Sequence, residues 1–569
     1  MPHKFNIDNL VVEPLRTRLS RTLSRPIVAD VQIPYISVIV PAVCAIAFGL
    51  ILYLGRTMDF FYDEWEFVLT APYWSWFDYF KPHNEHWSTV PKLVYKALSV
   101  LIGARSYLPY LAVLEFMHVC VAYLLFLMIR RRAGDLWAGA ACGLLLFLGR
   151  GFENILWAFQ IGFLGSVAFG LLAILLLEQS RSYWRQLILV GLALLVSMAS
   201  SDIGVAFYVV VAVELFIDSR RRHFLAALVV PGLAFGVWWL LIGQKNAAHD
   251  HLLSAAAFGS LVSYVPVGIG SAVAGTVGLS SNWSLIGFAA LAALMTLRYR
   301  ALGAQGLGMS AGLVAQYVLA GLARGATLGT QQASSSRYVY VGAVFVLLIC
   351  SLLLKDLPWR GWWRPLLVLL GVVVFLHGAS QLVIAAQQRQ GMFMVERAEL
   401  EAVWLVRSDP DVDRSARIDR ILMPTVKVGP YVDARKTVGS DLPNITFEQL
   451  RQLPSAPVNE ALRNVLPLRV NHVSSTFSGQ GCIPIGQQGR VDGDWAGGTR
   501  LMLKEAYPAS VQLTHWYDGM PPGTPDVVAE MWPNSALEIV LPRLPEHGRW
   551  RLRIQVPAGD PAEVCSVGE

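Results

Sequence analysis

Three carboxylates lie within four positions shortly after the first long apolar segment. They are Asp63, Glu64 and Glu66, in the run Phe60-Phe61-Tyr62-Asp63-Glu64-Trp65-Glu66. Ionisable residues near a bilayer are costly, which favours a functional role, whereas aromatic residues at that level are ordinary interfacial anchors. Close negative charges raise at least one pKa in such a cluster, and a raised pKa suits a general base. We interpret the cluster as catalytic; the alternative is a solvated loop end.

A second polar group follows at Pro82-His83-Asn84-Glu85-His86-Trp87. His83 and His86 are three positions apart with Glu85 between them, and these residue types could bind a divalent metal. Ring stacking or hydrogen bonding to a substrate is the interpretation that we favour. A divalent metal is therefore possible here, but no cofactor is expected.

Further polar residues lie at the ends of apolar segments that we predict to open on one side of a membrane. Glu153 could cap a helix, and Asp202 could be the N-cap of the next span; both could equally bind a substrate. Arg337 could snorkel to the interface, but we favour bidentate binding of a phosphate, with Arg150 and Arg324 as the next candidates. The candidate substrate-binding residues are Glu66, His83, Glu85, His86, Glu153, Asp202, Tyr338 and Tyr340.

The composition identifies the kind of protein that must position these residues. Of 569 residues, 54% are hydrophobic and 15% are charged, and the mean hydropathy is +0.48. A soluble domain carries about 25% charged residues, so the composition indicates a polytopic α-helical membrane protein. The net charge of +6 implies no nucleic-acid partner, because membrane proteins concentrate Lys and Arg on cytoplasmic loops.

The apolar segments predict about eleven membrane-spanning helices, since each crossing needs about 20 residues. The arginine triplets at 130–132 and 220–222 fall on the predicted cytoplasmic side, and we interpret them as topology markers only. Residues 249–281 are apolar but rich in Gly, Ala and Ser, and could form interfacial helices or a re-entrant pair. The spans are expected at residues 34–54, 107–129, 136–148, 163–177, 187–199, 203–217, 224–242, 283–297, 307–322, 338–354 and 366–386.

Three regions are expected: a cytoplasmic tail (1–33), a membrane domain (34–387) and an extracytoplasmic C-terminal domain (388–569). Residues 392–406 fit an amphipathic helix, and the short alternating runs beyond residue 500 predict a β-rich domain, a sandwich. Cys482 and Cys565 could form a disulfide there if that side is oxidising. The chain is then a multi-pass protein of the inner or plasma membrane with an extracytoplasmic site.

Asp63-Glu64 soon after the first span, about eleven spans and an extracytoplasmic C-terminal domain together resemble the GT-C glycosyltransferases. Protein O-mannosyltransferases and related bacterial transferases share this plan, although this chain has no inserted lumenal domain of the mannosyltransferase type. The resemblance covers residues 34–386. It implies transfer of a sugar from a polyprenyl-phosphate carrier to an extracytoplasmic glycan, lipid or protein acceptor, usually with inversion. It also implies Asp63 as the catalytic carboxylate with Glu64 beside it, and Arg337 at the lipid phosphate.

Two other functions remain open. A transporter or flippase of lipid-linked glycans would need charged residues inside the spans and a two-half repeat, and we expect neither. A non-catalytic membrane scaffold that displays the C-terminal domain would leave the one-sided group of polar residues unexplained.

Overall fold

The computed structural model describes residues 33–84, 86–179, 182–245, 254–355, 363–474, 480–505, 509–532, 535–559 and 562–567. These residues form two compact units. The helical unit contains residues 33–57, 74–94 and 108–387, and the mixed unit contains residues 58–73, 95–107 and 388–567. The predicted cytoplasmic tail lies outside the described residues, apart from Ile33. The segment with Asp63 belongs to the mixed unit, not to the helical unit in which sequence analysis places it.

Nine helices in the described part of the chain are long and apolar enough to cross a membrane. This makes the chain an integral, multi-pass membrane protein, as the composition predicts. Two shorter apolar helices, Ile203–Ile217 and Ser281–Leu297, accompany them. The helices are α2 (Ile36–Leu54), α5 (Leu108–Leu146), α7 (Ile161–Leu177), α8 (Tyr183–Ser200), α9 (Ile203–Ile217), α10 (Val229–Leu241), α11 (Ala255–Thr276), α12 (Ser284–Leu297), α13 (Tyr299–Leu328), α14 (Ser336–Leu354) and α15 (Trp363–Val406).

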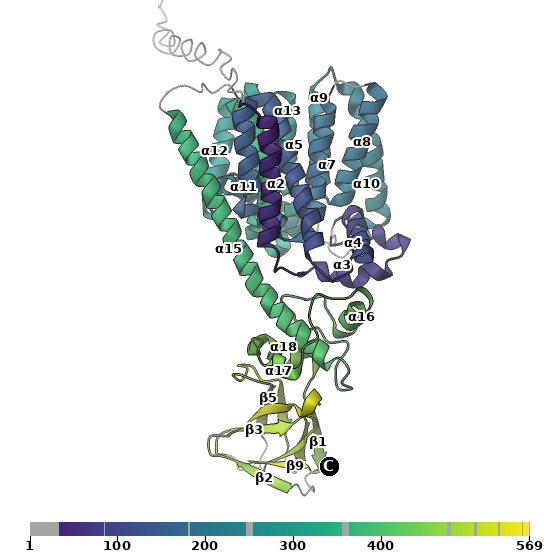
Figure 1. Cartoon of the computed structure of the whole chain (residues 1–569), viewed down its shortest axis with the longest axis vertical. Helices are drawn as coiled ribbons and strands as arrows, with labels where there is room; N and C mark the ends of the chain where they lie inside the picture. Colours follow the sequence, from purple (N-terminus) through teal and green to yellow (C-terminus); the bar gives the residue numbers. More distant parts are fainter. Residues whose placement is uncertain are drawn as a thin grey trace, which may run out of the picture. The chain divides into compact units, whose positions relative to one another are not determined.

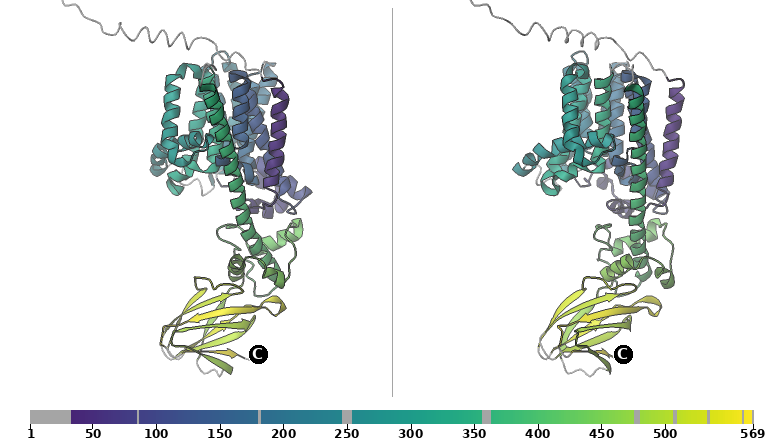
Figure 2. Two further views of the ribbon diagram at one scale, coloured as in Figure 1. Left: turned by 60° about the vertical axis from the view of Figure 1, so that its left-hand side comes forward. Right: turned by 90° about the vertical axis from the view of Figure 1, so that its left-hand side faces the viewer.

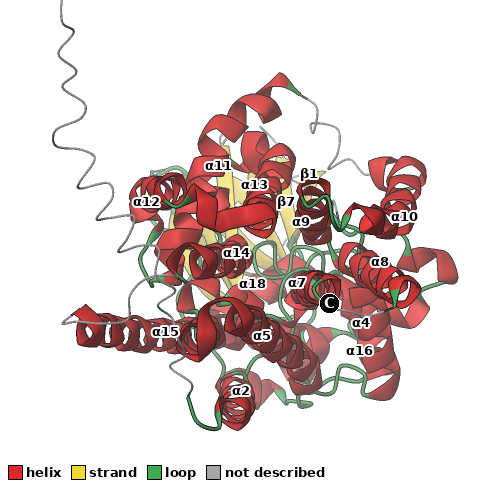
Figure 3. Cartoon of the chain, turned by 90° about the horizontal axis from the view of Figure 1, so that it is seen from above, coloured by secondary structure: helices red, strands yellow, loops and turns green. Residues whose placement is uncertain are grey.

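The most buried helices of the helical unit are α7 and α14, whose apolar stretches are 78% buried. Seen from above, they lie in the middle of the bundle, while α2, α10 and α12 lie at its rim (Figure 3). Figure 1 shows α7, α8, α9 and α10 standing side by side. The rim helices keep many large apolar side chains exposed, including Ile46 of α2 and Leu233 of α10, as expected where lipid replaces water.

Helix α5 consists of two helices that fold back on each other at Gly134, whose φ is 84°. His118 Nε2 lies 3.2 Å from the carbonyl oxygen of Leu146, 28 residues further along. A straight helix would separate these residues by about 42 Å at 1.5 Å per residue. The fold places Arg130–Arg132 at the tip between two antiparallel helices, which matches the two spans expected at 107–129 and 136–148.

The two arginine triplets do more than mark topology. Arg131 and Arg132 both pair with Glu178, and Arg221 pairs with the fully buried Glu214 at 2.8 Å. Arg221 therefore neutralises a carboxylate that would otherwise be buried without a counter-charge, while Arg131 and Arg132 pair with the partly exposed Glu178. Asp202 immediately precedes α9 and Arg220–Arg222 follow it, so the acidic site candidate and the basic triplet lie at opposite ends of this helix.

Helix α11 is anchored twice at one end of the bundle. Ser263 Oγ lies 3.1 Å from Thr330 Oγ1, in the connection between α13 and α14. Further along α11, a Cβ on Gly275 would lie 3.4 Å from the Cβ of Arg150, in the connection between α5 and α7. This part of α11 therefore does not run from one end of the bundle to the other, which fits both interpretations of this segment, interfacial helices and a re-entrant pair.

The mixed unit contains α3 (Glu64–Thr70), the last parts of α4 (Thr89–Leu101) and α15, three further helices and a two-sheet β domain. The helices are α16 (Val428–Val438), α17 (Phe447–Leu450) and α18 (Ser455–Val465). One sheet has the order β1-β7-β4-β9-β2 and the other β3-β8-β5-β6, all antiparallel. Figure 2 shows the strands of this domain as yellow-green arrows. The strands are β1 (Arg469–Ser474), β2 (Gln480–Ile485), β3 (Arg490–Ala496), β4 (Arg500–Glu505), β5 (Ala509–Trp516), β6 (Val527–Met531), β7 (Ser535–Val540), β8 (Arg549–Gln555) and β9 (Ala562–Val567).

The β domain predicted from alternating runs is confirmed. On β8, Trp550, Leu552 and Ile554 are fully buried and alternate with polar residues, as a half-buried strand requires. Cys482 of β2 and Cys565 of β9 are joined by a disulfide, with their Cα atoms 4.0 Å apart. This is the bond that sequence analysis expects.

Candidate functional site

The carboxylate cluster divides into one buried and two accessible side chains. Glu64 is fully buried at the start of α3 (Glu64–Thr70), whereas Asp63 is partly exposed and Glu66 is exposed. Both oxygens of Glu64 are held: Phe61 N donates to Oε2 at 2.9 Å and the Tyr95 hydroxyl donates to Oε1 at 2.8 Å. Glu64 therefore fixes the turn that presents Asp63, and we regard it as a positioning residue.

Burial controls the ionisation of Glu64. Loss of hydration raises the pKa of its carboxyl to about 8, although hydrogen bonds from Tyr95 and Phe61 oppose the shift. The sequence prediction that one pKa of the cluster is raised therefore holds at Glu64, with desolvation as the main cause. At neutral pH, Glu64 is mostly protonated and uncharged.

Asp59, which sequence analysis missed, is a second buried carboxylate in the same segment. Its side chain is 3% exposed; Phe60 N donates to Oδ1 at 2.8 Å, and Arg397 Nε lies 3.3 Å from Oδ2. Burial, followed by repulsion from Asp441, raises the pKa of Asp59 to about 7, against the attraction of Arg397. Arg397 also donates to Asp441 at 2.7 Å. The Arg397 guanidinium thus pairs with both Asp59 and Asp441.

A second arginine of α15 belongs to the same cluster. Arg389 is 6% exposed, and its guanidinium carbon lies 5.2 Å from the centre of the Phe61 ring, within cation–π range. Arg389 also acts electrostatically on Glu64. A signal for these residues exists in the sequence, because the charged Arg389, Glu396 and Arg397 follow the last apolar segment within the same helix, α15.

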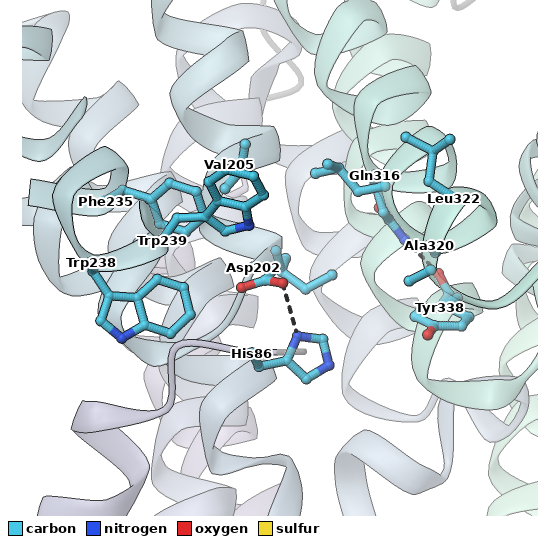
Figure 4. Close-up of a pocket in the computed structure, with 13 residues that line it drawn as sticks. His86, Asp202, Val205, Phe235, Trp238, Trp239, Gln316, Ala320, Leu322 and Tyr338 are labelled. Atoms are coloured by element: carbon cyan, nitrogen blue, oxygen red, sulfur yellow. Dashed lines mark hydrogen bonds and ion pairs between the residues drawn. The ribbon is translucent and has the colours of Figure 1, made fainter. Parts of the chain in front are cut away.

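The helical unit contains a separate cavity of about 340 Å³ (Figure 4). Phe235, Trp238 and Trp239 of α10 form one wall, and Gln316 and Tyr338 lie on the opposite side. His86 and Asp202 lie between these walls, and His86 Nδ1 is 3.4 Å from Asp202 Oδ2. The cavity is thus largely aromatic and apolar, with a few convergent polar groups, as is usual for small-molecule sites.

A tight turn positions His86. His83 and His86 exchange backbone hydrogen bonds of 3.0 and 3.1 Å, and Asn84 between them has a φ of 49°. Asn tolerates this left-handed conformation better than most residues. The His83 ring packs edge-on against Phe159, 5.1 Å away between ring centres. Glu85 lies outside the described residues.

Asp202 faces the cavity rather than capping its helix. It precedes α9, but its side chain makes no capping hydrogen bond within the described residues. Instead, Oδ1 accepts from Trp87 N at 3.3 Å and Oδ2 faces His86. Of the two interpretations from sequence, this geometry favours a site carboxylate.

Gln316 contributes a polar atom that sequence analysis missed. Its Nε2 donates to the carbonyl of Tyr338 at 3.1 Å, so the amide is fixed in place. Its Oε1 is buried and has no hydrogen-bond donor within the described part of the chain. Because a buried polar atom without a partner is costly, Gln316 is suited to accept a hydrogen bond from a ligand in the cavity.

Glu153 and Arg337 meet at the start of α14. Arg337 N donates to Glu153 Oε2 at 3.1 Å, and Glu153 N donates to Ser336 Oγ at 3.0 Å. This reciprocal pair favours the capping interpretation of Glu153. The Arg337 guanidinium lies 5.6 Å from the ring of Tyr338, which lines the cavity, and its Nε has no hydrogen-bond partner among the described residues.

Arg150, Arg324 and Tyr340 are not among the residues that line the cavity. Arg150 Nε donates weakly to the carbonyl of Gly278 at 3.4 Å, and Arg324 is a partly exposed residue of α13. Tyr340 is fully buried, with its hydroxyl 2.8 Å from His118 Nδ1. Its contacts are those of a core residue of the helical unit.

The expectation that the spans contain no charged residue is wrong. Glu115 of α5 is fully buried, and neither of its oxygens has a donor among the described residues. His118, one turn further along α5, is fully buried as well.

No protein-family model matches this sequence, and no curated protein matches it. Among solved structures, the chain is similar to the crystal structure of ArnT from Cupriavidus metallidurans bound to undecaprenyl phosphate, at 12% sequence identity and a TM-score of 0.45. The match covers 70% of this chain and 84% of that chain. At this score, the likeness assigns neither a substrate nor a functional residue to this chain.

Proposed function

We propose that the chain is a membrane glycosyltransferase of the GT-C kind, which moves a sugar from a polyprenyl-phosphate donor to an extracytoplasmic glycan, lipid or protein acceptor. The observation that carries the proposal is the aromatic cavity with His86, Asp202 and Gln316. Aromatic faces pack on the C–H surfaces of sugar rings, while a carboxylate and an amide bind their hydroxyl groups.

The proposed reaction is a single displacement at the anomeric carbon. An acceptor hydroxyl attacks this carbon as the bond to the phosphate oxygen breaks, and the electron pair of that bond leaves with the polyprenyl phosphate. Asp63 is the proposed base that takes the hydroxyl proton, because it is the accessible member of its pair while Glu64 is buried and held on both oxygens. One displacement inverts the configuration at the sugar carbon.

Arg337 is the proposed ligand of the lipid phosphate. Arg337 is partly exposed as a residue, and its guanidinium adjoins Tyr338, which lines the cavity. Arginine remains charged at all relevant pH values and can hold two phosphate oxygens at once. Asp202 and His86 are proposed to bind the sugar.

The test is sugar transfer by purified full-length protein in nanodiscs, with decaprenyl-phosphate-linked mannose, glucose and arabinose as donor probes. Asp63→Asn should reduce turnover by about 10²–10⁴-fold, which corresponds to about 3–5 kcal/mol of transition-state stabilisation. The control is Glu448→Gln, an exposed position of α17, which should retain full turnover. Full activity of Asp63→Asn would exclude Asp63 as the base.

A second candidate function, transport of a lipid-linked glycan, is favoured by Glu115 alone. Ionisable residues inside membrane helices often belong to transport or proton pathways. Vesicles that contain a fluorescent polyprenyl-phosphate lipid would distinguish the two functions. A transporter should move the lipid between leaflets and lose this activity in Glu115→Gln, whereas a transferase should show the same slow movement as protein-free vesicles.

A further inference from the structure

Three carboxylates from separate segments of the mixed unit converge near the C-terminal end of α15. They are Glu399 of α15, Asp419 of the following loop and Glu460 of α18. One oxygen from each lies within 4.8 Å of the others. This separation is about twice the Ca–O bond length of roughly 2.4 Å, the largest distance that two ligands of one Ca²⁺ ion can span.

Two of these three carboxylates are buried. Glu399 is 0% exposed and Asp419 is 3% exposed, while Glu460 is exposed and opens the site to water. Neither oxygen of Glu399 has a hydrogen-bond donor among the described residues. Its carboxyl group instead lies within hydrogen-bond reach of Asp419, which places two acceptors face to face. Such a contact requires a proton or a cation between the groups.

A fourth carboxylate provides independent support. Glu396, three residues before Glu399, shares its face of α15 and is 1% exposed. Both of its oxygens lack a donor in the described part of the chain. The charges that act on Glu396 are those of Asp59, Glu399, Glu64 and Asp419, all of them carboxylates. A fully buried, donor-free carboxylate that faces a carboxylate cluster indicates a missing positive charge.

The arginine nearest to Glu399 in the sequence of α15 already pairs with two other carboxylates. Arg397, between Glu396 and Glu399 in the sequence, pairs with Asp59 at 3.3 Å and Asp441 at 2.7 Å. Asp419 itself is held in place, because Ile421 N and Leu422 N both donate to its Oδ1. Asp419 is thus fixed by its backbone donors, and among the described residues no salt bridge joins Glu399, Asp419 or Glu460 to a basic side chain.

We propose that Glu399, Asp419 and Glu460 bind a divalent cation of the Ca²⁺ class, with Glu396 as a buried carboxylate that adds negative charge to the site. Hard cations of this size take six to eight oxygen ligands, so water completes the shell on the open side at Glu460. Carboxylate oxygens without nitrogen or sulfur ligands favour Ca²⁺ over zinc. The ion would tie α15, the Asp419 loop and α18 together. This inference does not depend on the proposed glycosyltransferase activity.

The test is calcium binding to the purified full-length protein after treatment with EDTA, followed by isothermal titration with CaCl₂ and, separately, MgCl₂. Wild-type protein should bind one Ca²⁺ per chain, with a dissociation constant of about 10⁻⁴–10⁻³ M, the range of extracellular modules. Ca²⁺ should also raise the melting temperature, because a ligand that binds only the folded state stabilises it.

Glu460→Gln is the key variant because this exposed side chain can change without disturbing the core. It should weaken Ca²⁺ binding by about tenfold or more, and Glu399→Gln should abolish it. The matched control Glu448→Gln, exposed on α17, should bind like wild type. Absence of saturable Ca²⁺ binding in wild type would overturn the proposal in favour of a shared proton. Unchanged binding in Glu460→Gln, or Mg²⁺ binding as tight as Ca²⁺ binding, would also overturn it.

Discussion

Replacement of Glu64 by Gln tests whether burial of this carboxyl makes the stability of the mixed unit depend on pH. The folded pKa of about 8 exceeds the ordinary value of 4.5, so the folded state binds the proton more tightly than the unfolded chain. The resulting stabilisation is complete below about pH 4.5 and is lost as the pH rises through about 8. Gln resembles the protonated carboxyl in shape and charge, so it should remove this dependence.

The two pKa values set the magnitude of the effect. Between pH 5 and pH 9, ionisation of a fully buried Glu64 removes about 4 kcal/mol of folding free energy, at about 1.4 kcal/mol per unit of pKa difference. For a domain of about 200 residues, this corresponds to a fall in melting temperature of about 8–16 °C. Asp59, whose pKa is about 7, adds to the wild-type slope and should leave a smaller slope in the variant.

The assay is thermal unfolding of the detergent-solubilised protein from pH 5 to pH 9, followed by tryptophan fluorescence. Glu64→Gln should melt at a similar temperature to wild type at pH 5 and at a clearly higher temperature at pH 9. Glu66→Gln, which changes an exposed carboxylate of the same helix, should keep the wild-type slope. The reasoning is refuted if Glu64→Gln shows the same pH slope as wild type.

Three further outcomes are expected. Arg337→Lys should weaken binding of decaprenyl phosphate, because Lys supplies a point charge without the planar fork; unchanged binding in Arg337→Ala would move the role to Arg150 or Arg324. Asp202→Asn should raise the KM for the donor more than it lowers kcat, and the opposite pattern would make Asp202 a candidate base. Cys565→Ser should destabilise the β domain by about 2–5 kcal/mol, because the disulfide closes a long loop; chemical denaturation with and without reductant would detect this loss, and equal stability would contradict it.

Local sequence signals were sufficient to predict helices and strands that a single segment of the chain determines. The apolar runs and basic triplets predict most of the helices, since span length and charge asymmetry are properties of neighbouring residues. Alternation along residues 500–556 predicts strands β4 to β8. The flanking strands were missed: β3, with Asp492-Gly493-Asp494 at its centre, lacks the apolar alternation of a buried strand.

Candidate site residues were proposed from sequence where they stand close together, as at Asp63-Glu64 and His83–His86. The sequence could not distinguish their roles, because burial decides which carboxylate is accessible. Glu64 and Asp63 are adjacent, yet only the fold makes one a buried anchor of the turn and leaves the other accessible.

The sequence by itself determined that this chain crosses a membrane many times and carries a β-rich C-terminal domain, since both follow from patterns within short windows. Only the tertiary structure decided which distant residues meet. Asp59 lies beside Arg397, 338 positions away, and Glu153 caps a helix that begins 183 positions later. The physical reason is that burial and charge pairing depend on distances in space, which a single sequence does not specify.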